Sequence, residues 1–147
     1  MEDHSKTYVA VELPSNQVIG FYTLSPHAID VSSLPPKILK KLPRFPTISA
    51  IYLATLGVHV ARQGHGLGTY LMADFLKACV RIADIGGGHF VVLDVINDDA
   101  ARMYRRIGFT DLPDQEPRMI MSMAKVRKAV QAAGGVRLVE TVPSHFS

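Results

Sequence analysis

The residues best suited to chemistry form a glycine-rich segment, Gln63-Gly64-His65-Gly66-Leu67-Gly68. A run rich in β-branched and aromatic residues, Ile48 to Val60, precedes it, and apolar residues follow it at helical spacing. A strand, a glycine loop and a helix N-terminus in this order favour an anion site. The first amides of a helix lack intrahelical partners and lie at the positive end of its dipole. The segment therefore predicts a pyrophosphate cradle, and the alternative interpretation is a simple turn leading into a helix.

The glycine loop differs from two common phosphate-binding patterns. No lysine precedes Thr69, so the GxxxxGK[ST] order is absent. The third glycine of a GxGxxG pattern comes too early, at Gly68. Taken alone, the loop therefore leaves both interpretations open.

The composition predicts one globular domain and argues against several classes of protein. A chain of 147 residues can bury a core, and a charged fraction of 20% argues against disorder. No apolar stretch reaches membrane-spanning length, and the polar start, Met1 to Lys6, has no secretory signal, so we expect a cytoplasmic protein. The single cysteine, Cys79, excludes an internal disulfide and is expected to be a small buried hydrophobe. The histidines show no HExxH or Cys/His spacing, so no metal site is expected.

Basic residues are grouped, and the net charge is +3. Each group is interpreted as a solvated face, although together they would also suit a polyanion such as an RNA end. No aromatic-basic RNA-binding signature accompanies them. The groups are Lys37, Lys40, Lys41 and Arg44; Arg102, Arg105 and Arg106; and Lys125, Arg127 and Lys128.

Periodicity and turn residues predict a mixed α/β (α+β) fold with a partly antiparallel sheet. Asn97 is expected to cap one helix, with Asp98 and Asp99 in its first turn, and Gly108 to end it. The expected strands are 7–13, 18–24, 48–60, 90–95, 118–124 and 136–142. The expected helices are 37–42, 66–84, 97–107 and 124–133, with a proline-broken segment over 25–46 and a glycine C-cap at 86–88.

A second block, Asn97 to Phe109, combines Asn97, Ala101, Tyr104, Gly108 and Phe109. With the glycine loop one helix and one strand upstream, this block resembles the GNAT superfamily of acyl-CoA-dependent N-acetyltransferases. Gln63 to Gly68 matches that family's [QR]xxGx[GA] loop, and the second block matches its Asn…Ala…Tyr…Gly-Phe pattern. Two motifs in the right order are more specific than either alone.

Further segments resemble the GNAT toxins of bacterial type II toxin–antitoxin pairs: Val18 to Ser25, Lys41 to Pro46 and Leu112 to Asp114. The resemblance implies acetylation of the α-amino group of aminoacyl-tRNA, which blocks translation. It also implies a homodimer and a ribbon-helix-helix antitoxin as partner. We expect one GNAT domain over 1–147, with a core at about 7–124 and a C-terminal extension at 125–147. The chain begins almost at the first hairpin, without the strand and helices that usually precede it in that subfamily.

The resemblance also implies the site residues for acetyl-CoA, the expected co-substrate. Tyr104 would be the general acid, since a phenol stays protonated at neutral pH and can donate to a leaving thiolate. Two identities for the base stay open, His59 and water. The residues expected to bind acetyl-CoA are Leu56, Gly57, Val58, Gln63, Gly64, His65, Gly66, Leu67, Gly68, Thr69 and Asn97. Asn97 has a second expected role as helix N-cap, and Gly57 suggests a bulge or a close backbone approach.

Three alternative functions stay open. The chain could acetylate a small amine or a protein N-terminus, or it could be a non-catalytic CoA-binding remnant, as its short N-terminal part would suggest. We also expect Val136 to Val142 to fill the sheet edge that a missing first strand would leave open, because open edges invite pairing.

Overall fold

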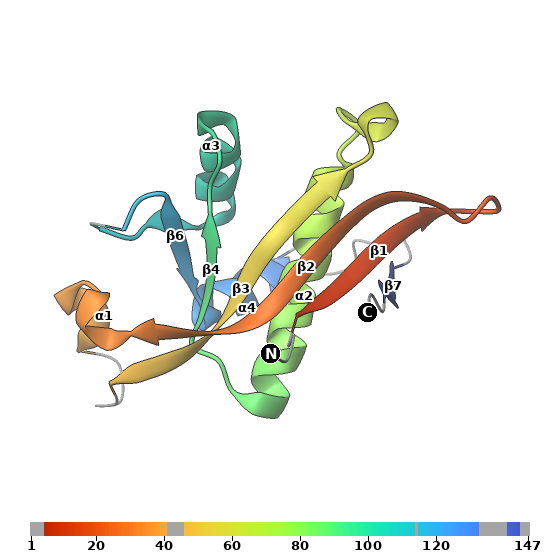
Figure 1. Ribbon diagram of the computed structural model, residues 1–147. Helices are drawn as coiled ribbons and strands as arrows, with labels where there is room; N and C mark the ends of the chain where they lie inside the picture. The colour runs from red at the N-terminus through yellow and green to blue at the C-terminus, as the bar shows by residue number, and fades with distance from the viewer. Residues whose placement is uncertain (1–4, 41–45, 114, 133–140, 145–147) are drawn as a thin grey trace.

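The computed structural model describes residues 5–40, 46–113, 115–132 and 141–144 (Figure 1). The strands are β1 (Lys6–Glu12), β2 (Gln17–Asp30), β3 (Thr47–Val58), β4 (Phe90–Asp94), β5 (Thr110–Asp111), β6 (Arg118–Ser122) and β7 (Thr141–Ser144). The α-helices are α1 (Pro36–Leu39), α2 (Leu67–Gly86), α3 (Asp98–Ile107) and α4 (Met123–Ala132), and two 3-10 turns are η1 (Val31–Ser33) and η2 (Val60–Arg62). None of the described helices is long and apolar enough to cross a membrane.

The strands form one sheet in the order β5-β6-β4-β3-β2-β1-β7. Only β3 and β4 run parallel, joined through α2, and the other neighbouring pairs are antiparallel. The mixed α/β fold with a partly antiparallel sheet is therefore confirmed. Of the strands in this order, β5 was not predicted from the sequence.

The second strand is longer than its sequence suggested. We expected a strand ending at Leu24 and a proline-broken segment after it, but β2 continues through Pro26 to Asp30. This prediction was wrong because β1 begins at Lys6, opposite Leu24, so that the rest of β2 lies past its pairing with β1. Beyond that point β2 is bordered by β3 alone, and a residue without an N–H group is tolerated at such an edge.

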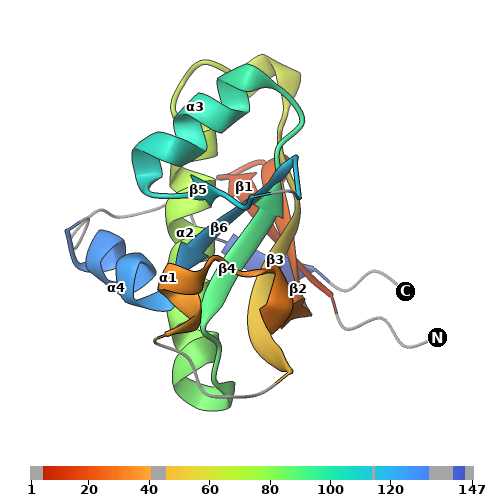
Figure 2. The same ribbon diagram turned by 90° about the vertical axis from the view of Figure 1, so that its left-hand side faces the viewer.

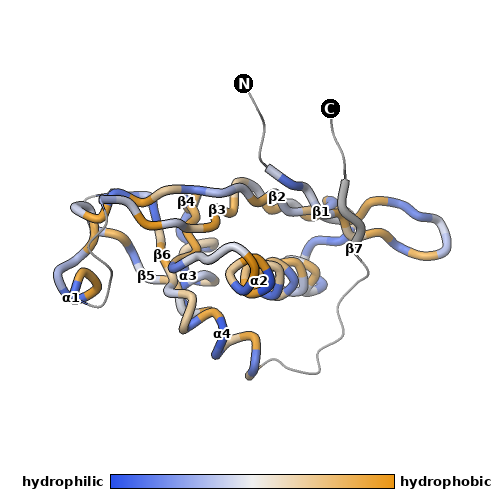
Figure 3. Tube along the Cα trace, turned by 90° about the horizontal axis from the view of Figure 1, so that it is seen from below, coloured by the Kyte–Doolittle hydropathy of each residue, from blue (hydrophilic) through white to orange (hydrophobic). Residues whose placement is uncertain are grey.

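Helices α2, α3 and α4 cover one face of the sheet, which we call the α2 face (Figures 2 and 3). α2 presents buried residues at helical spacing, including Leu71, Phe75 and Cys79, so its amphipathic pattern is confirmed. Cys79 is fully buried and its thiol pKa is raised by desolvation, which makes it an inert part of the core. The opposite face, which we call the front face, carries a smaller core with Ile29, Phe90 and Val92, against which α1 packs.

Most predicted boundaries agree with the structure. Asn97 caps α3, Gly108 ends it, Gly87 ends α2 with φ +81°, and β4 is buried on both faces. α1 begins at Pro36, one residue before the predicted Lys37, and ends at Leu39, before the predicted Leu42.

The chain after β6 forms a helix and an edge strand. α4 packs on the α2 face, and β7 pairs antiparallel with β1, with Thr7 opposite Ser144 and Ala10 opposite Thr141. The expectation that the chain's end fills this sheet edge is thus confirmed for Thr141 and Val142, and residues 136–140 of the predicted strand lie outside the described residues.

Candidate active site

Strands β3 and β4 separate part-way along the sheet and leave a wedge between them (Figure 1). Their parallel pairing runs from Ala50 opposite Phe90 to Leu53 opposite Leu93 and ends there. β3 continues for five residues to Val58, whereas β4 ends one residue later at Asp94. Past Asp94 the chain bonds to the other neighbour, since the Val95 N–H donates to the Pro117 carbonyl at 3.0 Å. The upper half of β3, Ala54 to Val58, is therefore without a strand partner on its β4 side.

Backbone groups of β3 are directed into this wedge. The Gly57 carbonyl lies toward β2, where an added Cβ on Gly20 would meet its oxygen at 3.2 Å, and the His59 N–H donates to the Ile19 carbonyl. Because antiparallel strands direct the polar groups of alternate residues to opposite sides, those of Leu56 and Val58 point away from β2. Leu56 thus offers a main-chain donor and acceptor to a ligand in the wedge, and Val58 offers its N–H, since the Gln63 side chain bonds to its carbonyl.

Gly57 provides a close approach of a different kind. A Cβ at this position would lie 2.6 Å from Cε1 of Phe21, so the aromatic ring rests against the bare backbone. The bulge in β3 lies elsewhere, at Ala54, where the register with β2 shifts between Thr23 and Leu24. Of the two expectations for Gly57, the close approach is therefore confirmed.

The glycine loop lies between the upper end of β3 and the start of α2. Gly64 and Gly66 both have φ +82°, which favours glycine, and an added Cβ would meet nothing within 4 Å at either position. Gly66 is the N-cap residue of α2 and has no side chain to close the helix end. The first amides, from Leu67 to Thr69, therefore remain available to an anion at the positive end of the dipole.

Two contacts hold the turn before this loop in place. Arg62 of η2 forms a bidentate ion pair with Glu12 of β1, with both Nη2–Oε distances at 2.7 Å. The Gln63 side chain donates to the Val58 carbonyl at 3.2 Å. The pair is partly solvent-exposed and contributes little free energy, but its fork geometry fixes how the loop leaves the sheet.

His59 and His65 are both exposed. The Nδ1 atom of His59 accepts a hydrogen bond from the Ala61 N–H at 3.1 Å, so the side chain caps η2. This structural role already occupies one ring nitrogen of His59, the residue that the sequence offered as a candidate base.

Asn97 begins α3 directly beyond the wedge. Its Oδ1 accepts from the Ala100 N–H at 2.8 Å, so the expected N-cap is confirmed. The side-chain NH₂ group is the part left for a ligand, since a primary amide carries two further donors.

Tyr104 lies two helical turns into α3, on its buried side. The ring packs edge-to-face on Phe109, with centroids 5.8 Å apart, and joins the core of the α2 face together with Leu56 and Val58. Burial raises the pKa of the Tyr104 phenol, and no charged or hydrogen-bonding neighbour contributes to that shift. The hydroxyl therefore stays protonated well above neutral pH, as a proton donor must.

Two of the three arginines of α3 form exposed ion pairs. Arg102 bonds to Asp99, and Arg105 bonds to Asp111 with Nη2–O distances of 3.1 and 3.2 Å. These contacts support the solvated-face interpretation for this basic group. Within the described residues, no cluster of three or more histidine, cysteine or acidic side chains is suited to hold a metal ion.

A polar network that the sequence did not suggest lies at the base of the wedge. Asp94 accepts hydrogen bonds from Tyr52 and Arg118, and Arg118 also contacts His27. These residues come from four strands spread over ninety positions, so spacing along the chain could not bring them together. One signal was available in the sequence: Asp94 ends the apolar run Phe90 to Leu93, and in a strand it shares a face with Phe90 and Val92.

Comparison with known proteins agrees with this geometry. The family model described as "Acetyltransferase (GNAT) domain" matches residues 3–111. The chain belongs to the GNAT acetyltransferase family. Its sheet, flanked by helices and split between β3 and β4, is a GNAT fold, and as a family member the chain is an N-acetyltransferase.

Two curated relatives are toxins by name. The chain is 32% identical over 132 residues to "Probable toxin TacT" of Sinorhizobium fredii, spanning 85% of this chain and 73% of that protein. It is 27% identical over 114 residues to the "tRNA-acetylating toxin" of Mycobacterium tuberculosis, spanning 78% and 67% of the two chains.

Solved structures share the fold. A tyrosine-to-phenylalanine mutant of KacT superposes with a TM-score of 0.77 at 22% identity, covering 85% of this chain and 75% of that one. "AtaT complexed with acetyl-methionyl-tRNAfMet" gives a TM-score of 0.77 at 24% identity, with the same coverage. AtaT has also been solved with acetyl-CoA and with the C-terminus of its antitoxin AtaR.

Proposed function

We propose that this enzyme transfers the acetyl group of acetyl-CoA to the α-amino group of an aminoacyl-tRNA and so blocks translation. The single observation that supports this most is the relatedness to a tRNA-acetylating toxin and a TacT toxin over most of the chain. The wedge, the open glycine loop and the protonated phenol supply the parts that such a transfer needs.

The described residues fit acetyl-CoA as the donor. The free amides of Leu67 to Thr69, beside two glycines that open onto empty space, suit the pyrophosphate. The main-chain groups of Leu56 and the N–H of Val58, which point away from β2, suit the amides of the pantetheine arm, and the NH₂ group of Asn97 would add a further donor. His65 and Gln63 of the same loop would lie near the pyrophosphate, and Gly57, against which the Phe21 ring packs, would lie beside the arm.

The chemistry is attack of a neutral amine on a thioester carbonyl. The new C–N bond forms, the C–S bond breaks and the electron pair leaves with sulfur. Tyr104 donates its phenolic proton to that sulfur, and the core packing of its ring against Phe109 holds the hydroxyl in place. The amine loses its proton to water, since Nδ1 of His59 is engaged in capping η2.

Several partners follow from this proposal. An enzyme acting on charged tRNA works in the cytoplasm. A ribbon-helix-helix antitoxin would neutralise it, in line with the antitoxin complex of AtaT, and the chain would form a homodimer like the toxins it resembles.

A cell-free translation assay tests the proposal directly. The purified chain with acetyl-CoA should stop protein synthesis, and mass analysis of the aminoacyl ends of tRNA should show an added acetyl group. Omitting acetyl-CoA is the control. Transfer to a small amine or a peptide N-terminus with unmodified tRNA would assign a different acceptor, and acetyl-CoA binding without any transfer would indicate a non-catalytic remnant.

A further inference from the structure

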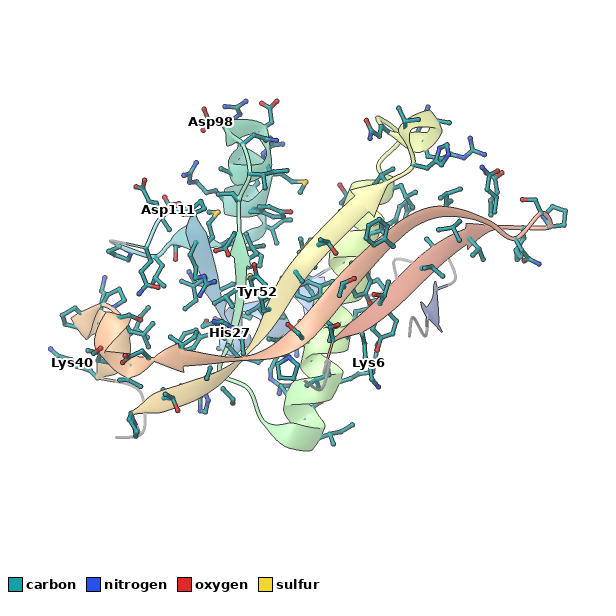
Figure 4. The ribbon with its side chains drawn as sticks, viewed as in Figure 1. Lys6, His27, Lys40, Tyr52, Asp98 and Asp111 are labelled. Carbon is teal, nitrogen blue, oxygen red and sulfur yellow. The ribbon has the colours of Figure 1, made fainter. Side chains whose placement is uncertain are left out.

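Four side chains meet on the front face where β3 and β4 begin to separate, and we call them the fork network: His27, Tyr52, Asp94 and Arg118. Figure 4 labels two of them, His27 and Tyr52, whose ring centroids are 5.5 Å apart. The Tyr52 hydroxyl donates to Oδ2 of Asp94 at 2.9 Å. The Arg118 guanidinium donates to both carboxylate oxygens, at 3.0 and 3.2 Å. Asp94 is thus held from two directions at once.

The two sets of bonds act on opposite sides of β4. Tyr52 of β3 lies opposite Val92, one pair before the last, so its bond to Asp94 holds β3 and β4 together at the base of the wedge. Arg118 of β6 lies opposite Asp94, and its bonds hold the end of β4 to β6. The bond from the Val95 N–H to the Pro117 carbonyl continues that attachment. β4 is paired with β6 along its whole length, and Asp94 is the position at which it loses β3 as a neighbour and keeps β6.

The network is half-buried, and its members contact one another in several ways. The side chains of Arg118 and Asp94 are 25% and 33% exposed. The Arg118 guanidinium lies 5.5 Å from the centroid of the Tyr52 ring, and its Nη1 atom lies 3.1 Å from Nε2 of His27. Hydrogen bonds from Arg118 keep the pKa of Asp94 below its usual value, so the carboxylate stays charged.

The end of β4 leads directly to α3, the helix that carries Asn97 at its start and Tyr104 further along. Asn97, which caps α3, follows Asp94 by three residues, and Tyr104 lies on that helix. A change in the direction of β4 at Asp94 would alter both the width of the wedge and the position of the phenol.

We propose that Asp94 is a positioning residue, which Tyr52 and Arg118 hold so that the wedge opens at the width that a pantetheine arm requires. This inference rests on the proposed use of acetyl-CoA. It assigns to the fork network a role in binding the arm, and none in binding the nucleotide end, because the glycine loop lies at the far end of β3.

Calorimetry with two ligands tests this role. Acetyl-CoA needs both the loop and the wedge, whereas adenosine 3′,5′-bisphosphate carries only the nucleotide end. In Asp94→Asn the affinity for acetyl-CoA should fall about tenfold, the equivalent of one lost charge-assisted hydrogen bond. The affinity for the bisphosphate should stay within about twofold of the wild-type affinity, a change smaller than the loss of one hydrogen bond would cause. Tyr52→Phe should act in the same direction with less effect. Arg118→Lys should also weaken acetyl-CoA binding, since lysine keeps the positive charge but lacks the planar fork.

Asp111→Asn is the matched control, since it breaks the exposed Arg105–Asp111 pair outside the network and should change neither affinity. Equal acetyl-CoA affinity in Asp94→Asn and the wild type would overturn the proposal, as would a parallel loss for both ligands, which indicates general destabilisation. Should Asp94→Asn fail to fold, Tyr52→Phe decides by the same criteria. A wild-type chain that binds the bisphosphate but not acetyl-CoA would contradict the proposed function itself.

Discussion

The two halves of β3 differ in what lies beside them. Ala50 to Leu53 are paired with β2 on one side and β4 on the other, and three of these four residues are buried. Ala54 to Val58 keep β2 but lose β4, and all are exposed or half-buried. The lower half contributes to the core through side chains, and the upper half offers its backbone. The second half of β3 can therefore bind a ligand through its backbone because β4 no longer pairs with it.

The largest expected effect concerns the phenol beside the open half. Tyr104→Phe should lower turnover about a hundredfold or more, since a general acid contributes at least that much, and should leave acetyl-CoA affinity nearly unchanged. Steady-state kinetics and calorimetry measure the two quantities. Tyr8→Phe is the control, because this half-buried tyrosine stacks on Tyr22 away from the wedge. Equal turnover in Tyr104→Phe would remove it as the acid.

The next effect compares two glycines at the ends of α2. Gly66 and Gly87 have φ +82° and +81°, and an added Cβ at either meets nothing within 4 Å. Alanine at each should cost about 1 kcal/mol of unfolding free energy from the left-handed backbone. Gly66→Ala should also weaken acetyl-CoA binding about tenfold, because its methyl group enters the phosphate position. Denaturation measures the loss of stability, and calorimetry measures acetyl-CoA affinity. Similar acetyl-CoA affinities in Gly66→Ala and Gly87→Ala would argue against the pyrophosphate cradle.

A smaller effect is expected at the sheet edge farthest from β6. Removing residues 134–147 exposes the edge of β1 that β7 covers and should lower the unfolding free energy by about 1–2 kcal/mol, while acetyl-CoA affinity stays the same. Chemical denaturation and light scattering measure stability and aggregation. A truncated chain as stable and as soluble as the full chain would show that β7 adds nothing.

The smallest effect is a pH dependence of the fork network. The pKa of Asp94 lies below its ordinary value of 3.8, chiefly through its hydrogen bond to Arg118. The resulting stability is therefore present above pH 3.8 and is lost as pH falls through the lower pKa of the folded state. Asp94→Asn should be less stable than the wild type by about 1 kcal/mol at pH 7, and this difference should shrink below pH 3.8. Denaturation curves at several pH values measure this stability difference. A difference between the wild type and Asp94→Asn that stays constant with pH would contradict the prediction.

Local signals in the sequence predicted much of the fold. Asn97, Gly87 and Gly108 act at helix ends, where one residue's hydrogen bonds or backbone angles decide the structure. Pro26 was misleading because a proline is tolerated there only where β2 has no β1 neighbour, and this depends on the register of β2 with the first residue of β1, Lys6. The glycine loop and the Tyr104 helix were located correctly, while the roles of their residues in binding and catalysis stay predictions.

The fork network and the Arg62–Glu12 pair could not be predicted for the same reason. Each joins strands or turns whose proximity follows from the order β6-β4-β3-β2-β1. Arg62 and Glu12 are fifty residues apart, and neither sits in a recognisable motif. Side-chain contacts across a sheet become visible only after the register is known.

The extra residue in β3 has a consequence for insertions and deletions. Before Ala54, the odd-numbered Ile51 and Leu53 face the α2 side, and after it the even-numbered Leu56 and Val58 do. One inserted position thus reverses the phase of the strand and keeps aliphatic groups on the interior in both halves. Because Ala54 itself is exposed, exchange for another small residue should be harmless. Its removal would turn Leu56 and Val58 outward and Gly57 inward. The number of residues in this part of β3 therefore matters more than which small residue stands at position 54.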